Sequence, residues 1–592
     1  MPIVMRRMAL IGLVQGVVLW VLATLVDGKH WPSDNMAVLL GLVYTAVAIP
    51  AAWYLSEDVA GVSKQRRRVV VIALGVGLGL LGVCEGWVNQ DVQGPFKPGP
   101  SLPACIALGF VALPLLLHAG GRHTDSTDRR TWGWNYADLF QTTWRNAMVL
   151  AITALLTGIF WVVLLAGGHL MKSIGITLVL DLIGTNFFIS LASSIVVSCA
   201  AALALSRTDT IVVLRRFWLS LNQAFLPLVL LFSTMWAVAL PFTGVEPLFQ
   251  TRRAALVLLW FAVLAINFVN AARQDGLAPA PFVPWLRRAL AYAWLTMLVV
   301  VAVAALAIYQ RVAQYGWTAD RVWSVFVLLM AAGYAIGYSL SVFKPVRGWM
   351  WSIDQTNVAM AIVLCVGLLA LASPLADARR ISVASQLDRL LAGKTALDDF
   401  DFYYLKYRSG TYGTRAMQAM IDGIPGHAQA DMLSKTAQLA RDGKLRSGNL
   451  LSPANMDDSA MRSKLKPVND QTSVPPAVVD ALIAHLRTES GPRSEDICAY
   501  DYGKCSVWMA DLDGDDKQEV VLIVNKSWQH VAQVFNWQPD TATLTYAGEI
   551  NGVTQTWIDG LGDGTVTFPQ SKWRDINAGG VQLRVTPPDT DR

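Results

Sequence analysis

The residues best placed to do chemistry form one short acidic run near the C-terminus. Carboxylates alternate at Asp511, Asp513 and Asp515 and return at Glu519, and the main-chain carbonyl of Lys517 falls between them. Alternate positions of a tight loop can direct several oxygens toward one point, and calcium takes about six to eight oxygen ligands. The spacing therefore predicts a Ca²⁺ site made by these five residues. The competing interpretation is a solvated acidic turn between two strands.

This loop differs from an EF-hand, because Gly514 stands at its fourth position and no Glu occupies its twelfth. It resembles the nine-residue calcium loop found between strands in integrin-type β-propeller repeats. Such loops occur in several copies in a propeller, whereas this chain has one copy. The resemblance therefore implies a metal site and not a propeller.

Two of the six cysteines, Cys498 and Cys505, lie just before the acidic run. In an oxidising compartment they are expected to form a disulfide that closes a short loop. A zinc site would need two more ligands, and none has a suitable spacing. The other cysteines lie in or beside apolar segments, where a free thiol behaves as a small hydrophobic side chain.

Sequence motifs give little support to catalysis. The chain has no HExxH, no GxSxG and no Walker loop, and the histidines of its C-terminal part stand alone. A lone histidine is more often structural than catalytic. Nothing in the sequence marks nucleic-acid binding. The pattern favours a non-enzymatic protein.

The composition shows which elements must hold these residues. Of 592 residues, 54% are hydrophobic and 15% are charged, against about 25% charged in an ordinary soluble domain. Residues 1–373 contain 25 Lys and Arg and 15 Asp and Glu, whereas residues 374–592 contain 23 and 28. A single soluble globule is excluded. We predict a basic membrane domain over residues 1–373, followed by a slightly acidic soluble domain.

A membrane-spanning helix needs about 20 mostly apolar residues. About eleven stretches meet this requirement, near residues 8–26, 36–55, 69–88, 103–118, 147–167, 185–205, 218–241, 254–271, 290–309, 322–343 and 357–373. With the N-terminus in the cytoplasm, 18 of the 25 basic residues of this domain fall on the cytoplasmic side. An odd number of crossings then places the C-terminal domain outside, in the periplasm of a Gram-negative bacterium. The basic cluster Lys64–Arg68 is expected to contact anionic lipid headgroups.

Several polar residues interrupt the apolar segments. Asp181 lies in His169–Gly184, which we expect to be an amphipathic helix at the outer interface. Its carboxylate either faces water or binds a cation or substrate. Asn267, Asn270 and Glu85 either line a polar path or make interhelical hydrogen bonds. Four glycines of the third span share one face and predict close packing against another helix: Gly75, Gly79, Gly82 and Gly86.

The loop between the ninth and tenth spans reads Arg311-Val-Ala-Gln-Tyr315-Gly-Trp317-Thr-Ala-Asp-Arg321. It resembles the Arg-x-x-x-Tyr-Gly-Leu-Thr-x-x-Arg signature of a bacterial inner-membrane family, the domain-of-unknown-function 4153 family, with Trp317 in place of leucine. Lys172–Leu180 is also similar to that family's Lys-x-Ile-Gly-Ile segment. The resemblance implies a multi-pass membrane fold and no assigned activity. Arg311, Tyr315 and Arg321 either bind a lipid phosphate or carboxylate, or anchor the hairpin at the interface.

The soluble part divides by pattern. Residues 374–450 are predicted to be helical, residues 451–475 a linker rich in Ser, Asn, Asp and Pro, and residues 476–592 a mostly antiparallel β module with a helical start. The predicted fold is thus a polytopic α-helical bundle of about eleven transmembrane helices, N-in and C-out, plus a C-terminal soluble α+β domain.

The leading functional hypothesis is a non-enzymatic envelope sensor or scaffold in the bacterial inner membrane. Its periplasmic domain would bind Ca²⁺ and a periplasmic protein partner. A transporter or channel for a small solute or ion is the alternative, and a lipid-processing enzyme is the third class.

Overall fold

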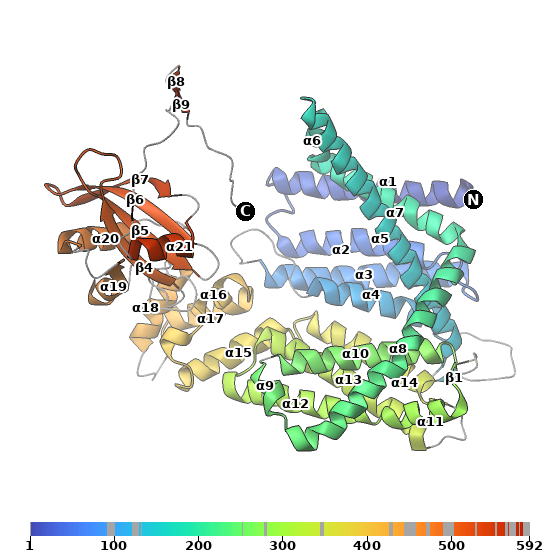
Figure 1. Ribbon diagram of the computed structural model, residues 1–592. Coiled ribbons are helices and arrows are strands. Elements are labelled where there is room, and N and C mark those ends of the chain that lie inside the picture. Colours follow the sequence, from blue (N-terminus) through green and yellow to red (C-terminus); the bar gives the residue numbers. More distant parts are fainter. Residues whose placement is uncertain are drawn as a thin grey trace. The chain divides into compact units, whose positions relative to one another are not determined.

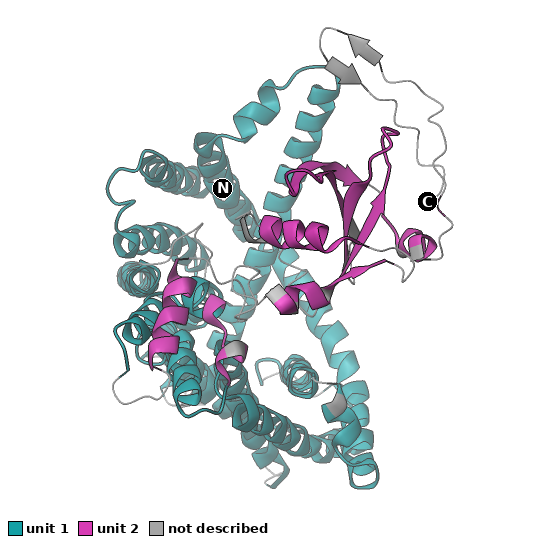
Figure 2. Cartoon of the chain, turned by 90° about the vertical axis from the view of Figure 1, so that its left-hand side faces the viewer, with its two compact units in different colours: residues 1–395, 404–427 teal, residues 396–403, 428–592 magenta. Residues whose placement is uncertain are grey.

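The computed structural model describes most of the chain (Figure 1). The described residues are 2–90, 101–120, 130–131, 133–251, 253–276, 281–343, 349–424, 430–442, 458–468, 474–488, 503–526, 530–550, 553–562, 566, 576–578 and 581–583. They form two compact units, coloured separately in Figure 2. Unit 1 comprises residues 1–395 and 404–427, and unit 2 comprises residues 396–403 and 428–592.

Unit 1 is helical and contains every predicted membrane span. Eleven helical segments among the described residues are long and apolar enough to cross a membrane, which confirms the predicted number. Its longer helices are α1 Pro2–Asp27, α2 Met36–Leu55, α3 Lys64–Val88, α4 Ser101–His118, α5 Tyr136–Ser173, α7 Asn186–Ser206, α8 Thr208–Thr243, α10 Ala254–Arg273, α11 Pro284–Ala293, α12 Thr296–Tyr315, α13 Ala319–Phe343 and α14 Ile353–Leu371. Short elements are β1 Arg130–Thr131, β2 Trp134–Asn135, α6 Leu178–Ile183 and α9 Glu246–Gln250.

The glycine face predicted on the third span packs against the second. A Cβ atom added to Gly82 of α3 would lie 2.6 Å from the Leu40 carbonyl oxygen, and one added to Gly86 would lie 2.2 Å from that of Met36. Neither position has room for a side chain, so glycine allows the backbones of α2 and α3 to approach closely. The predicted role of these glycines in packing is confirmed.

The segment before the sixth span differs from the prediction. His169–Gly184 is not one amphipathic helix, because α5 continues to Ser173 and α6 begins only at Leu178. Gly175 separates them with a φ of +87°, a left-handed conformation that ends a helix. The prediction of one amphipathic helix over His169–Gly184 is therefore wrong.

Unit 1 continues past the composition boundary at residues 373 and 374. Two further helices belong to it, α15 Ala378–Leu391 and α17 Thr411–Ile421. Between them lie η2 Leu397–Asp399 and α16 Phe402–Tyr407. The described residues of the segment predicted to be helical, 374–450, thus contain helices, while residues 425–429 and 443–450 lie outside the described part of the chain.

Unit 2 contains a five-stranded sheet in the order β3-β4-β5-β6-β7. Only the β3–β4 pair is parallel, and part of the predicted linker is structured, since it supplies α19 and β3. The elements are α18 Ala430–Arg441, α19 Asp458–Lys464, β3 Leu465–Pro467, α20 Pro476–Thr488, β4 Gly503–Ala510, β5 Glu519–Lys526, β6 His530–Gln538, β7 Thr543–Ile550 and α21 Gln555–Gly562. A separate hairpin pairs β8 Ile576–Ala578 with β9 Val581–Leu583.

The central strand β5 organises the core of unit 2. Val520, Leu522 and Val524 pack with residues of α20 on one face, while Val521 and Ile523 pack near α21 on the other. This period-two pattern makes β5 apolar on both faces, as expected for a strand covered on both sides. A well-packed strand therefore holds the end of the acidic run in place.

Candidate functional site

The acidic run lies in the turn of a β-hairpin. β4 ends at Ala510 and β5 begins at Glu519, and these two residues are opposite each other in the antiparallel register. The register therefore brings Asp511, the first residue of the turn, near Glu519. Gly514 and Asp516 turn the chain with φ angles of +81° and +64°.

Three of the five predicted metal ligands converge. Asp511, Asp513 and Glu519 each offer one carboxylate oxygen, and these three oxygens lie within 4.8 Å of one another. Main-chain N–H groups orient all three carboxylates: Leu512 donates to Glu519 Oε2 at 2.8 Å, Gly514 to Asp511 Oδ1 at 2.6 Å and Asp515 to Asp513 Oδ1 at 3.2 Å. Among the described residues, no basic side chain forms an ion pair with this acidic triad. Its oxygens suit a hard divalent cation such as Ca²⁺.

Asp515 and Lys517 bond to each other instead of joining the triad. The Lys517 N–H donates to Asp515 Oδ1 at 2.8 Å, and the ammonium nitrogen lies 3.3 Å from Oδ2. The main-chain hydrogen bond lowers the pKa of Asp515 below its ordinary value, so this exposed carboxylate is ionised at neutral pH. Asp515 would have to leave Lys517 to act as the predicted fourth carboxylate ligand.

The predicted disulfide falls partly outside the described residues. Cys505 lies in β4 and its side chain is buried in the core between the sheet and α20. Cys498 is not among the described residues, so the pairing stays a prediction. The four cysteines of unit 1 are free: Cys84, Cys105, Cys199 and Cys365.

The loop that joins α12 to α13 is folded around Tyr315. Arg321 donates a 2.5 Å hydrogen bond to the Gly316 carbonyl, and its guanidinium carbon lies 5.5 Å from the Tyr315 ring centre. The guanidinium carbon of Arg311 lies 5.9 Å from the same ring. The predicted polar group is therefore brought together, and both arginines make cation–π contacts within their own loop.

This loop also forms hydrogen bonds with α15. Trp317 N–H donates to Ser385 Oγ at 3.0 Å, and Gln386 Nε2 donates to the carbonyls of Tyr315 and Trp317 at 3.0 and 2.8 Å. Gly316 has a φ of +72°, and a Cβ atom there would lie 2.4 Å from Cδ of Arg389. Any other residue would be strained and would displace α15. The loop thus holds α15, the first helix after the last span, in place.

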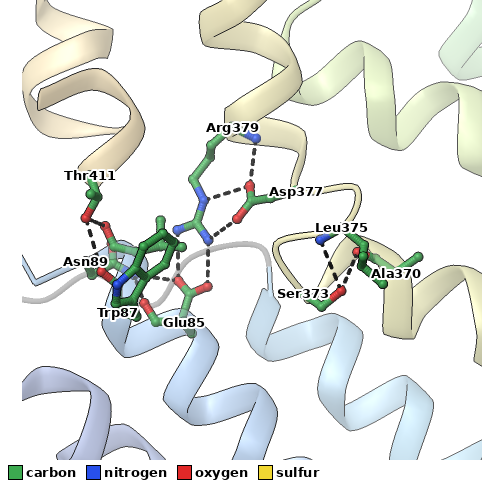
Figure 3. Close-up of polar contacts among 10 residues, drawn as sticks. Glu85, Trp87, Asn89, Ala370, Ser373, Leu375, Asp377, Arg379 and Thr411 are labelled. Atoms are coloured by element: carbon green, nitrogen blue, oxygen red, sulfur yellow. Dashed lines mark hydrogen bonds and ion pairs between the residues drawn. The ribbon is translucent and has the colours of Figure 1, made fainter. Parts of the chain in front are cut away.

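A buried ionic cluster holds the start of α15 (Figure 3). The Arg379 guanidinium donates to both carboxylate oxygens of Glu85 at 3.0 and 2.8 Å, and to both oxygens of Asp377 at 3.1 and 2.7 Å. Asp377 also accepts from the Arg379 N–H at 2.8 Å and so caps the helix. The Arg379 and Glu85 side chains are only 7% and 1% exposed.

The charged groups of this cluster are almost fully paired with one another. Burial alone would lower the pKa of Arg379, but its hydrogen bonds to Asp377 and the charge of Glu85 outweigh it, so the pKa is raised above its ordinary value. Asn89 Nδ2 donates a further 2.7 Å hydrogen bond to Glu85. The carboxylates are thus occupied by protein donors, and the cluster joins α3 to α15.

Sequence reasoning found Glu85 but missed its partners. A carboxylate at the end of a span needs a compensating charge, and the Asp-x-Arg pattern at Asp377 and Arg379 directly follows the last span. The carboxylate at the end of one span, together with an arginine just after another, was the signal in the sequence that could have predicted this ion pair. Asp181, by contrast, is exposed and forms no side-chain hydrogen bond or ion pair within the described part of the chain.

The amides inside the bundle make interhelical hydrogen bonds. Asn267 donates to Asn222 at 2.8 Å, which joins α10 to α8. Asn270 donates to the Tyr338 hydroxyl at 2.9 Å and accepts from Asn357 at 2.6 Å. Hydrogen bonding, one of the two predicted roles of Asn267 and Asn270, is therefore confirmed.

These features define a multi-pass helical membrane protein. The model of the family described as domain of unknown function (DUF4153) matches residues 16–421, more than half of the chain, so the chain belongs to this family. This confirms the resemblance seen in the loop Arg311–Arg321. The matched region ends with α17 and does not include the hairpin that carries the acidic triad. No curated protein and no solved structure matches the chain.

Proposed function

We propose that the chain is a non-enzymatic sensor or scaffold of the bacterial inner membrane whose C-terminal domain binds Ca²⁺. The convergence of Asp511, Asp513 and Glu519 in one turn carries the proposal. Three carboxylates without a paired cation offer the oxygen ligands that Ca²⁺ prefers, and main-chain carbonyls or water would complete a shell of about six to eight. Asp515 and the Lys517 carbonyl are the proposed further ligands.

The C-terminal domain is proposed to face the periplasm. The excess of basic residues in alternate loops and the odd number of spans support this orientation. A Cys498–Cys505 disulfide would fit the same compartment. Alkaline phosphatase fused after Arg592 should be active, while a cytoplasmic reporter at the same position should be inactive. The reverse pattern would contradict both the orientation and the disulfide.

Two kinds of partner are proposed. Lys64 and Arg68 are exposed and are the members of the basic cluster that would contact anionic headgroups. Arg66 and Arg67 instead donate to protein groups, Arg66 to the Leu116 carbonyl at 3.2 Å. A periplasmic protein is the proposed partner of the C-terminal domain.

Calcium titration of the purified full-length protein by calorimetry tests the central proposal. We expect one site with a Kd of about 0.1–1 mM, as in extracellular calcium modules. Asp513→Asn should weaken binding at least about tenfold. Asp516→Asn removes the same charge from the same turn without touching the triad, and should leave the affinity within about threefold. Equal losses in both variants would indicate a general charge effect and not a site.

A further inference from the structure

A cavity of about 240 Å³ lies inside the helix bundle of unit 1. Residues of α4, α5, α10, α13 and α14 line it, and none of them is exposed or charged. Four aromatic side chains contribute to its wall: Tyr136, Phe140, Trp144 and Tyr334. The cavity is therefore a partly open, uncharged space with an aromatic part to its wall, within the helix bundle of unit 1.

Asn270 and Asn357, which line the cavity, belong to a closed ring of hydrogen bonds. Asn357 donates to Asn270 at 2.6 Å, Asn270 donates to Tyr338 at 2.9 Å, and the Tyr338 hydroxyl donates back to Asn357. The second amide protons go to the Ile266 carbonyl and the Tyr136 hydroxyl, both at 2.8 Å. The protein itself thus uses all four amide protons of the ring.

The hydroxyl proton of Tyr136 has no acceptor in this ring. The Tyr136 hydroxyl accepts from Asn357, but it donates to no group among the described residues, although the residue is only 8% exposed. The Tyr334 hydroxyl, on α13, makes no hydrogen bond within the described part of the chain. A buried donor without an acceptor is costly, and both phenols line the cavity. Two unused O–H donors therefore face the same space.

We propose that this cavity binds the uncharged, carbonyl-bearing head group of a membrane-dissolved lipid. Two phenol donors match an acceptor such as a carbonyl oxygen, and aromatic walls suit a flat or extended uncharged group. A charged head group would find no counter-charge in the lining and would be strongly disfavoured. The volume is below the roughly 300–1,000 Å³ of a site for a whole drug-sized molecule, so the lipid tail would remain in the bilayer. An isoprenoid quinone ring and the ester carbonyls of a neutral glycerolipid both present this chemistry.

Native mass spectrometry of the full chain in detergent tests the proposal with two added probes, decylubiquinone and dioleoylglycerol. We expect saturable binding of one molecule of at least one probe, and the probe that binds identifies the source of the carbonyl. Tyr334→Phe removes a donor without breaking any hydrogen bond of the protein. It should weaken binding about tenfold, the effect of losing one hydrogen bond.

Two further variants guard against indirect effects. Tyr309→Phe changes a tyrosine that is 70% exposed on α12 and should bind as the wild type does. Ala361→Phe places a large side chain in the cavity wall and should abolish binding while leaving the amide ring intact. The proposal is overturned if neither probe saturates, if Tyr334→Phe and Ala361→Phe both bind as the wild type does, or if anionic phosphatidylglycerol binds equally well.

Discussion

The buried cluster at the start of α15 and the acidic turn of unit 2 both gather carboxylates, but only in the first does a basic side chain pair with the carboxylates that converge. Glu85 and Asp377 share the Arg379 guanidinium, with every contact between 2.7 and 3.1 Å. The acidic triad of the turn has main-chain N–H donors but no paired basic side chain among the described residues. A built-in cation makes a carboxylate cluster structural, whereas its absence leaves ligands for a metal.

Removing the built-in cation should have the largest effect. Arg379→Ala leaves Glu85 and Asp377 buried without a counter-charge, so we expect the free energy of unfolding of unit 1 to fall by about 3–5 kcal/mol. Thermal or denaturant unfolding of the full-length protein in detergent measures this. Arg380→Ala is the matched control, because Arg380 is exposed and donates only to the Leu375 carbonyl. Similar losses in the two variants would contradict the structural role of the cluster.

Adding Ca²⁺ should have the next largest effect. With Ca²⁺ in excess over its Kd, we expect unit 2 to gain about 1–3 kcal/mol of stability through binding to the folded state alone. A chelator should reverse the gain. Differential scanning fluorimetry with probes in each unit measures both transitions. A calcium-induced shift confined to unit 1 would reverse the roles of the two clusters.

Asp515 should have a smaller effect than the triad. Its carboxylate is already bonded to Lys517, so recruitment to calcium requires breaking those bonds. We expect Asp515→Asn to weaken calcium binding by only about threefold, compared with about tenfold for Asp513→Asn. Calorimetry on the two variants gives the ratio. A loss in Asp515→Asn as large as that in Asp513→Asn would mean that the turn rearranges around the ion.

Alkaline pH should leave the buried cluster unchanged. The pKa of Arg379 is raised in the folded protein, so its stabilising contribution is fully present below the ordinary pKa and is lost only as pH rises through the higher folded value. Between about pH 7 and 10 the guanidinium is charged in both states. Arg379→Lys, by contrast, should lose stability once the pH rises above about 10.4, the ordinary pKa of lysine, because a lysine paired with two carboxylates has a raised pKa in the folded protein. Unfolding curves from about pH 7 to 11.5 compare the two proteins.

Much of the fold could be predicted from sequence because the lipid environment imposes strict rules. Each span needs a long apolar helix, so all eleven were recognisable, and the glycine face of α3 indicated close packing against another helix. In unit 2 the sequence predicted a mostly antiparallel β module, but not the order of its strands. The helix break at Gly175 was missed because an apolar periodicity runs across it, and only the backbone conformation shows the turn.

The candidate sites were harder to predict because they join residues far apart in sequence. The acidic triad lies within one turn, and its spacing alone identified it. Arg379 is far from Glu85 along the chain, and Asn357 and Tyr136 meet Asn270 only through packing. The presence of a carboxylate or amide in an apolar segment signals that the side chain needs a partner, but it does not say which residue that partner is.

Hydrogen–deuterium exchange of the full-length protein with and without calcium tests most directly whether the acidic triad binds calcium while the buried cluster does not. We expect Ca²⁺ to protect main-chain amides in the turn between β4 and β5, where the N–H groups of Leu512 and Gly514 orient the ligands. The start of α15 should exchange slowly and equally with or without the ion. An unprotected turn at millimolar calcium, or calcium-dependent protection at α15, would contradict this distinction.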